Sequence, residues 1–203
     1  MPMMMTVRSA LVALLCLSLF GCATRPLVLA PRVKPLDTSP TRQHDALVLM
    51  PFQDAVPEDD IGRKRFRDGP IDVFNDTLLV GLRTSQVFAR VVRSTEAAGV
   101  GYRLSGVLRS LKTDESVLKF ALASSTMGIT ATCLVSFRLD DARTGAILLE
   151  DTFTATGRGQ ARVYGGGQYT QYDSTSGDEE SLSEAISEAA GAIVRLVADF
   201  MAR

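Results

Sequence analysis

The chain of 203 residues carries 22 basic and 23 acidic side chains, a formal net charge of −1. That balance argues against nucleic acid as a partner, because binding to phosphates needs a surplus of basic residues. The length beyond the apolar start of the chain is about that of one domain, and it is sufficient for a hydrophobic core.

An apolar stretch runs from Ala10 to Phe20 near the start of the chain. It has the length of the hydrophobic region of a signal peptide and is too short to span a bilayer. The tetrapeptide Leu19-Phe20-Gly21-Cys22 that closes it resembles the lipobox of bacterial lipoprotein signal peptides, although Phe20 is larger than the residue usual there. An ordinary secretory leader and an uncleaved anchor helix are the alternatives.

The resemblance implies that residues 1–21 are removed as a signal peptide and that Cys22 is the lipidation site. In that family the thiol is joined to a diacylglycerol and the new amino terminus is acylated, with fatty acids such as palmitate. Ala23 follows the cysteine, which in the Gram-negative pattern implies the outer membrane. Each buried methylene contributes about 0.8 kcal/mol, so the acyl chains imply a permanent anchor for a domain that faces the periplasm.

Cys133 is the cysteine that remains once Cys16 leaves with the leader and Cys22 is lipidated. An intramolecular disulfide is then impossible. Cys133 lies in an apolar strand pattern, which predicts a buried and unreactive thiol.

Residues 22–44 are predicted to hold the lipidated cysteine and a proline-rich tether that lifts the domain off the membrane. Proline at this density blocks a helix and favours extended, semi-rigid chain. The four prolines are Pro26, Pro31, Pro35 and Pro40. The alternative is that residues 27–29 pack back onto the domain as an edge strand.

Residues 45–203 are predicted to form one periplasmic α/β domain. The continuous apolar run Ala46–Met50 is typical of a strand buried on both faces. Gly69 and Pro70 mark a helix start, since proline suits the first helical position. That helix has an apolar face made of Ile71, Phe74, Leu78 and Leu82. Strands are predicted next over residues 87–92 and 102–108.

The clearest hairpin turns at Gly145, where a positive φ is needed. Apolar and polar residues alternate on both sides of it, over residues 133–140 and 147–154. Ser181 and Glu184 have the spacing of a capping box and predict the start of a final helix. Its buried stripe is Leu182, Ile186, Ala190, Ile193, Val197 and Phe200. The order β-α-β-β-β-β-α predicts an α+β fold, a single mixed or mostly antiparallel sheet with two helices packed on one face.

This arrangement resembles a group of Gram-negative envelope lipoproteins. The resembling pieces are residues 47–52, Leu82 to Phe88, Tyr102 to Gly106, Leu139 to Gly145 and the final helix. The group includes curli secretion channel lipoproteins, lipoprotein activators of peptidoglycan synthases and transport auxiliary lipoproteins. The resemblance implies a non-enzymatic accessory or scaffold protein of a cell-envelope assembly or transport complex.

The sequence has no recognisable catalytic motif, in agreement with that expectation. His44 is the single histidine and is expected to be solvated at the end of the tether. No nucleophile elbow, phosphate-binding loop or paired-cysteine metal signature occurs, so neither a metal nor another cofactor is predicted. The acidic runs 58–60 and 178–180 are expected to be solvated loop charges.

Three segments are candidates for partner binding. Arg63, Lys64 and Arg65 form a basic patch in an expected loop, suited to anionic lipid headgroups or simply solvated. Residues 113–129 form a second irregular segment. The third, residues 157–177, is a glycine-rich stretch with Tyr164, Tyr169 and Tyr172, and tyrosine is common at interfaces; its alternative is a mobile loop.

A pore subunit is the rival function. In curli channel lipoproteins the places corresponding to residues 113–129 and 157–177 hold the strands of an oligomeric membrane barrel. A barrel strand needs about ten residues, with alternate residues forming an apolar face toward the lipid. Here the alternate residues from Ala161 to Tyr169 form only a weakly apolar face. The sequence leaves the oligomeric state and the envelope partner open.

Overall fold

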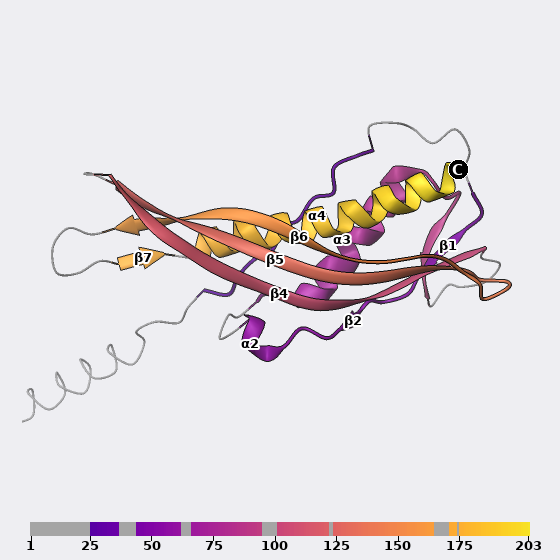
Figure 1. The fold of residues 1–203 in the computed structure, drawn as a ribbon, viewed down its shortest axis with the longest axis horizontal. Coiled ribbons are helices and arrows are strands. Elements are labelled where there is room, and N and C mark those ends of the chain that lie inside the picture. The colour runs from indigo at the N-terminus through magenta and orange to yellow at the C-terminus, as the bar shows by residue number, and fades with distance from the viewer. Residues whose placement is uncertain are drawn as a thin grey trace, which may run out of the picture.

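The computed structural model describes residues 25–36, 44–61, 66–94, 101–121, 124–164, 171–173 and 175–203. Its elements are β1 (Leu47–Leu49), β2 (Gln53–Asp54), α2 (Glu58–Ile61), α3 (Pro70–Ser85), β3 (Val91–Arg93), β4 (Tyr102–Ala121), β5 (Ser124–Asp141), β6 (Ile147–Tyr164), β7 (Gln171–Asp173) and α4 (Thr175–Met201). The described strands form one mixed sheet in the order β3-β1-β4-β5-β6-β7, with β2 paired to β4 outside this path. The predicted α+β class is confirmed, and α3 and α4 lie on one face of the sheet (Figure 1).

The parallel and antiparallel parts of the sheet follow from the chain order. β1 pairs in parallel with β3 and β4, because α3 crosses over between β1 and β3. From β4 to β7 every neighbour is antiparallel, since short connections join successive strands. All three residues of β1 are buried, as a strand in the parallel part of the sheet should be.

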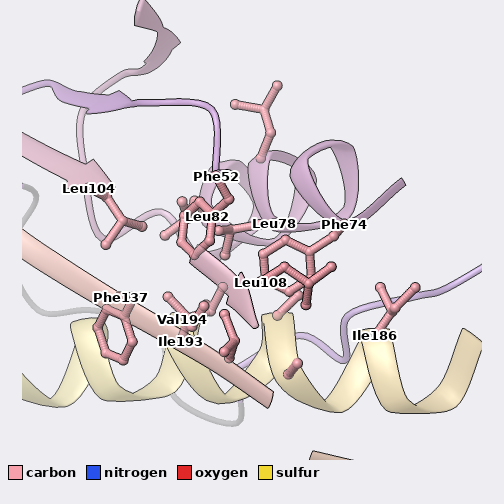
Figure 2. Close-up of a cluster of buried hydrophobic side chains, with 14 of the residues drawn as sticks. Phe52, Phe74, Leu78, Leu82, Leu104, Leu108, Phe137, Ile186, Ile193 and Val194 are labelled. Carbon is pink, nitrogen blue, oxygen red and sulfur yellow. The ribbon is translucent and has the colours of Figure 1, made fainter. Parts of the chain in front are cut away.

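The core lies between the sheet and the two helices. On β5, Cys133, Val135, Phe137 and Leu139 are at most 1% exposed, which confirms the predicted apolar face of this strand. On β6 the alternation is not matched by burial, since Ile147 is 54% exposed. The predicted stripe of α4 is buried except for the half-buried Phe200. Figure 2 shows Phe137 of β5 facing α4, with Ile193 and Val194 between that helix and the side chains of α3.

The start of α3 was predicted correctly, and the start of α4 was not. Pro70 opens α3, and Gln86 ends it in the left-handed conformation with φ of 58°. However, α4 begins at Thr175, so Ser181 is no N-cap; its hydroxyl donates to the carbonyl of Asp178 within the helix. The acidic runs 58–60 and 178–180, expected in loops, are helical in α2 and α4.

Within residues 113–129 and 157–177, the parts that the structure describes are strand or helix and not the irregular chain that the sequence suggested. β4 and β5 remain paired as far as Ala121 and Ser124, and β6 continues to Tyr164. Gly157 and Gly159 look like strand breakers, but they stay in β6 because α4 crosses it closely. A Cβ atom on Gly159 would lie 2.1 Å from the carbonyl oxygen of Gly177.

Candidate functional site: an N-terminal segment docked on the last helix

The residues singled out from the sequence lie mostly outside the part of the chain that the structure describes. This holds for Cys22, Tyr169 and the basic patch Arg63, Lys64 and Arg65. The backbones of Tyr164 and Tyr172 lie side by side, because Tyr164 pairs with Gln171 and Val163 with Tyr172. The side chains of these two tyrosines are also outside the described part, so their role in partner binding stays a prediction.

Residues 25–36 lie along α4. We call residues 25–36 the N-terminal segment. The amide of Val28 donates to Glu179 Oε1 at 2.7 Å, that of Ala30 to Ser183 Oγ at 3.0 Å, and that of Arg32 to Ser187 Oγ at 2.8 Å. The partners advance together, so the segment runs parallel to the helix, from its first turns toward its C-terminal end (Figure 1).

This ladder works because two repeats match. Residues four apart on a helix lie on one face and are separated by about 6 Å along the axis. Residues two apart in an extended chain advance by about 6.6 Å. Acceptors at 179, 183 and 187 therefore meet the amides of residues 28, 30 and 32 in step. The hydroxyl of Ser187 donates its own proton to the carbonyl of Ser183, which leaves its lone pair for Arg32.

The residues between the hydrogen-bonded positions are apolar or proline. Leu27 is 5% exposed and belongs to the main core, while Leu29 and Val33 pack against it. Pro31 and Pro35 occupy positions whose N–H the ladder does not use, so their missing donor costs nothing there. The alternation that predicts an extended, semi-rigid tether is also the pattern of an extended chain docked on one side.

Val33 lies near glycines of both helices, and its close fit to α3 depends on the glycine at position 81. A Cβ atom on Gly81 of α3 would lie 3.1 Å from both Cγ atoms of Val33, and one on Gly191 of α4 would lie 3.8 Å from Cγ1. Leu27 is fixed further by its carbonyl, which accepts from the amide of Arg67 at 2.9 Å. The segment is thus held by α3, α4 and the chain ahead of α3, not as an edge strand of the sheet.

Ion pairs mark the two ends of the segment but do not hold it. Arg25 lies 3.5 Å from Glu179, and Lys34 lies 3.8 Å from Glu188. Both basic side chains are largely exposed, and pairs of this kind contribute about 0–1 kcal/mol. The docking is stabilised instead by the burial of apolar side chains and by the three hydrogen bonds from backbone amides.

The opposite flank of α4 covers β6. The amide of Gln160 donates to Glu180 at 3.3 Å, and that of Arg158 donates to Glu184. These amides point away from β5, on the side of β6 where β7 pairs only with residues 162–164. Two glutamates one helical turn apart therefore close a sheet edge that would otherwise be open to pairing with another chain.

Two side chains of types that can take part in catalysis, His44 and Cys133, are packed within the fold. His44 is half-buried, and its ring centroid lies 6.4 Å from that of Phe88 and 6.3 Å from that of Tyr102, which corrects the expectation of a solvated histidine. Burial raises the pKa of the Cys133 thiol to about 12, so it is protonated and unreactive at neutral pH, as predicted.

Neither a metal cluster nor a spanning helix is found in the described ranges. There, no three His, Cys, Asp or Glu residues are grouped to hold a metal ion. Among the helices of the same ranges, none has the length and apolar character needed to cross a membrane.

The comparisons with known proteins bear on the fold. No family model and no curated protein matches the chain. Protein XCC0632 from Xanthomonas campestris, of family DUF330, superposes with a TM-score of 0.61 at 13% identity, covering 87% of this chain and 96% of that one. Protein CT253 from Chlamydia trachomatis superposes with a TM-score of 0.46 at 12% identity, covering 78% of this chain and 98% of that one. A minor lipoprotein from Acinetobacter baumannii superposes with a TM-score of 0.34 at 13% identity, covering 76% of this chain and 92% of that one. The first of these shows a shared fold.

Proposed function

We propose that this chain is a lipid-anchored, non-enzymatic accessory or scaffold protein of a cell-envelope assembly or transport complex. Lipid on Cys22 would hold it at the outer membrane, with the domain in the periplasm. The observation that carries the proposal is the docked N-terminal segment, whose first described residue, Arg25, comes three residues after Cys22. A lipobox followed at once by chain fixed to the domain makes a firm mechanical link between membrane and fold.

The surroundings of the reactive side chains support a role in docking. The Cys133 thiol is protonated in the core, and His44 packs against two aromatic rings. Serine hydroxyls on α4 accept hydrogen bonds from the N-terminal segment. Each of these groups serves the fold, which supports a role carried by surfaces of the domain.

Labelling with radioactive palmitate in a Gram-negative host tests the anchor. Cys22→Ser should abolish the label and leave the leader attached. Cys16→Ser is the matched control, because this thiol lies within the leader, and it should keep the label. Label retained by the Cys22 variant would overturn the lipid-anchored function.

Crosslinking in intact envelopes tests the accessory role. Replacing Tyr164, Tyr169 and Tyr172 together by Ser should leave folding intact and weaken capture of an envelope partner, since aromatic anchors carry much of the energy of an interface. His44→Ala should leave capture unchanged. Unchanged capture by the triple variant, with loss in the His44 variant, would contradict the docking role. A large ring on size measurement after membrane extraction would favour the pore subunit instead.

A further inference from the structure

We infer that the bilayer lies at the end of the domain where α4 begins and where β4 and β5 end, so that this hairpin end meets the lipid surface. We call the ends of β4 and β5, at Ala121 and Ser124, the hairpin tip. The inference rests on the proposed lipidation of Cys22 and adds to it the orientation of the domain and its contact with lipid.

The proposed anchor has a short reach. From Cys22 to Arg25 the chain spans three residue steps, which is at most about 11 Å. A free tether as far as His44 would span 22 steps, or about 75 Å when extended. Docking of the N-terminal segment removes most of that length. The domain is therefore held against the membrane and does not stand off from it.

The anchor leaves the domain near the first turns of α4. Arg25 and Val28 both contact Glu179, in the first turns of α4. The helix continues for 22 residues beyond Glu179 to Met201, which corresponds to about 33 Å. The lipid is therefore attached near the start of α4, and the C-terminal end of the helix lies far from it.

The hairpin tip lies at the same end of the domain as the start of α4. Gly177, in the first turn of α4, is level with Ile129 of β5 and Ala161 of β6, since a Cβ atom there would lie within 2.9 Å of both residues. β5 extends five residues past Ile129 to Ser124, about 17 Å further. Figure 1 shows the hairpin tip, the first turn of α4 and the beginning of the N-terminal segment at one end of the molecule.

The composition of the tip suits a lipid surface. The last five residues of β4 are Val117, Leu118, Lys119, Phe120 and Ala121, four of them apolar and one basic. Aromatic and basic residues next to apolar ones are typical of chain at the boundary of headgroups and acyl chains. At the opposite end of the sheet the β5–β6 turn contains Asp141, Arg143 and Thr144, which are polar.

Tryptophan fluorescence tests the orientation, because the chain has no tryptophan of its own. Ser124→Trp places a reporter at the hairpin tip, and Ala202→Trp places one just beyond α4. The mature chain, beginning at Cys22, is coupled through that thiol to maleimide-bearing lipid in vesicles of phosphatidylethanolamine, phosphatidylglycerol and brominated phosphatidylcholine. Cys133 does not couple, because it is buried and protonated.

We expect bromine to remove most of the emission of the Ser124 reporter and little of that of the Ala202 reporter. Equal quenching of the two, or stronger quenching at residue 202, would overturn the inference. An unattached chain with Cys22→Ser and the Ser124 reporter should show little quenching. If it is quenched as strongly as the coupled chain, the anchor does not set the orientation.

A release variant tests the cause. Glu179→Ala, Ser183→Ala and Ser187→Ala together remove the acceptors of the ladder and free the N-terminal segment, so quenching at residue 124 should fall toward that at residue 202. Asp199→Ala, on the exposed face of the same helix, should change nothing. Quenching that survives the triple change would show that docking does not orient the domain. Chemical coupling bypasses cellular lipidation, so failure of palmitate labelling and failure of this test are separate results.

Discussion

The backbone amide of Val28 donates a 2.7 Å hydrogen bond to the carboxylate of Glu179, across 151 residues of sequence. It joins the chain just after the proposed lipid site to the first turns of the last helix. Because one partner is a charged carboxylate, the bond is of the stronger kind. Through this contact, and the two that follow it along α4, a pull on the proposed membrane anchor would be transmitted to the core of the domain.

Glu179→Ala is expected to loosen the N-terminal segment. It leaves the part-buried amide of Val28 without its acceptor, which lowers the stability of the docked segment by about 1–3 kcal/mol. Trypsin should then cut faster after Arg32, the one basic residue of the segment that no proline follows. Glu188→Ala is the matched control, because its exposed pair with Lys34 contributes about 0–1 kcal/mol. Equal cutting of both variants would show that Glu179 does not hold the segment.

Ile193→Ala should destabilise the whole domain. Ile193 is fully buried in α4, and such a truncation in a packed core costs about 2–5 kcal/mol. Since small domains have a stability of about 5–15 kcal/mol, the melting temperature measured by circular dichroism should fall clearly. Glu188→Ala should leave it nearly unchanged. Equal small shifts would mean that α4 does not dock on the sheet.

Gly159→Ala should separate α4 from β6. The added methyl group would lie 2.1 Å from the carbonyl oxygen of Gly177, which is backbone and cannot turn aside as a side chain could. Overpacking of this kind costs about 1–3 kcal/mol, or more where backbone must move. Thr156→Ala, at an exposed position of the same strand, should have a small effect in urea unfolding. A Gly159 variant as stable as the wild type would contradict the close crossing.

Cys133 makes stability fall at alkaline pH. Burial raises the pKa of its thiol from 9.0 to about 12 in the folded state, so above pH 9 the unfolded chain releases a proton that the folded chain keeps. The thiol's contribution is complete below pH 9 and is lost as the pH rises toward 12. Cys133→Ala should flatten this part of the stability profile. Rapid reaction of the native thiol with a disulfide reagent at pH 8 would contradict its burial.

The sequence predicts the fold where local pattern and tertiary packing agree. The apolar run at β1, proline at the start of α3 and the glycine turn between β5 and β6 each select one local structure, and the structure confirms all three. Residues 157–159 mislead because glycine in a strand usually signals a break. Here glycine is needed for the crossing of α4, a contact between segments about 20 residues apart that no local window contains.

The candidate site was predictable only in part. Cys22 is proposed from its resemblance to a lipobox, but the proline-rich pattern after it fits a free tether and a docked segment equally well. What decides between them is the spacing of Glu179, Ser183 and Ser187, about 150 residues away. The spacing of these acceptors indicates docking only when an extended chain lies beside the helix. Neither α4 nor the N-terminal segment predicts the contact on its own.

Amide hydrogen exchange, resolved residue by residue by NMR, tests the central claim that the N-terminal segment is docked on α4. The account predicts that the amides of Val28, Ala30 and Arg32 exchange much more slowly than in an unstructured peptide of the same sequence. It further predicts that Ser183→Ala removes the protection of Ala30 first. Exchange of all three at the rates of the unstructured peptide, while Ile193 in the core of α4 remains protected, would contradict it.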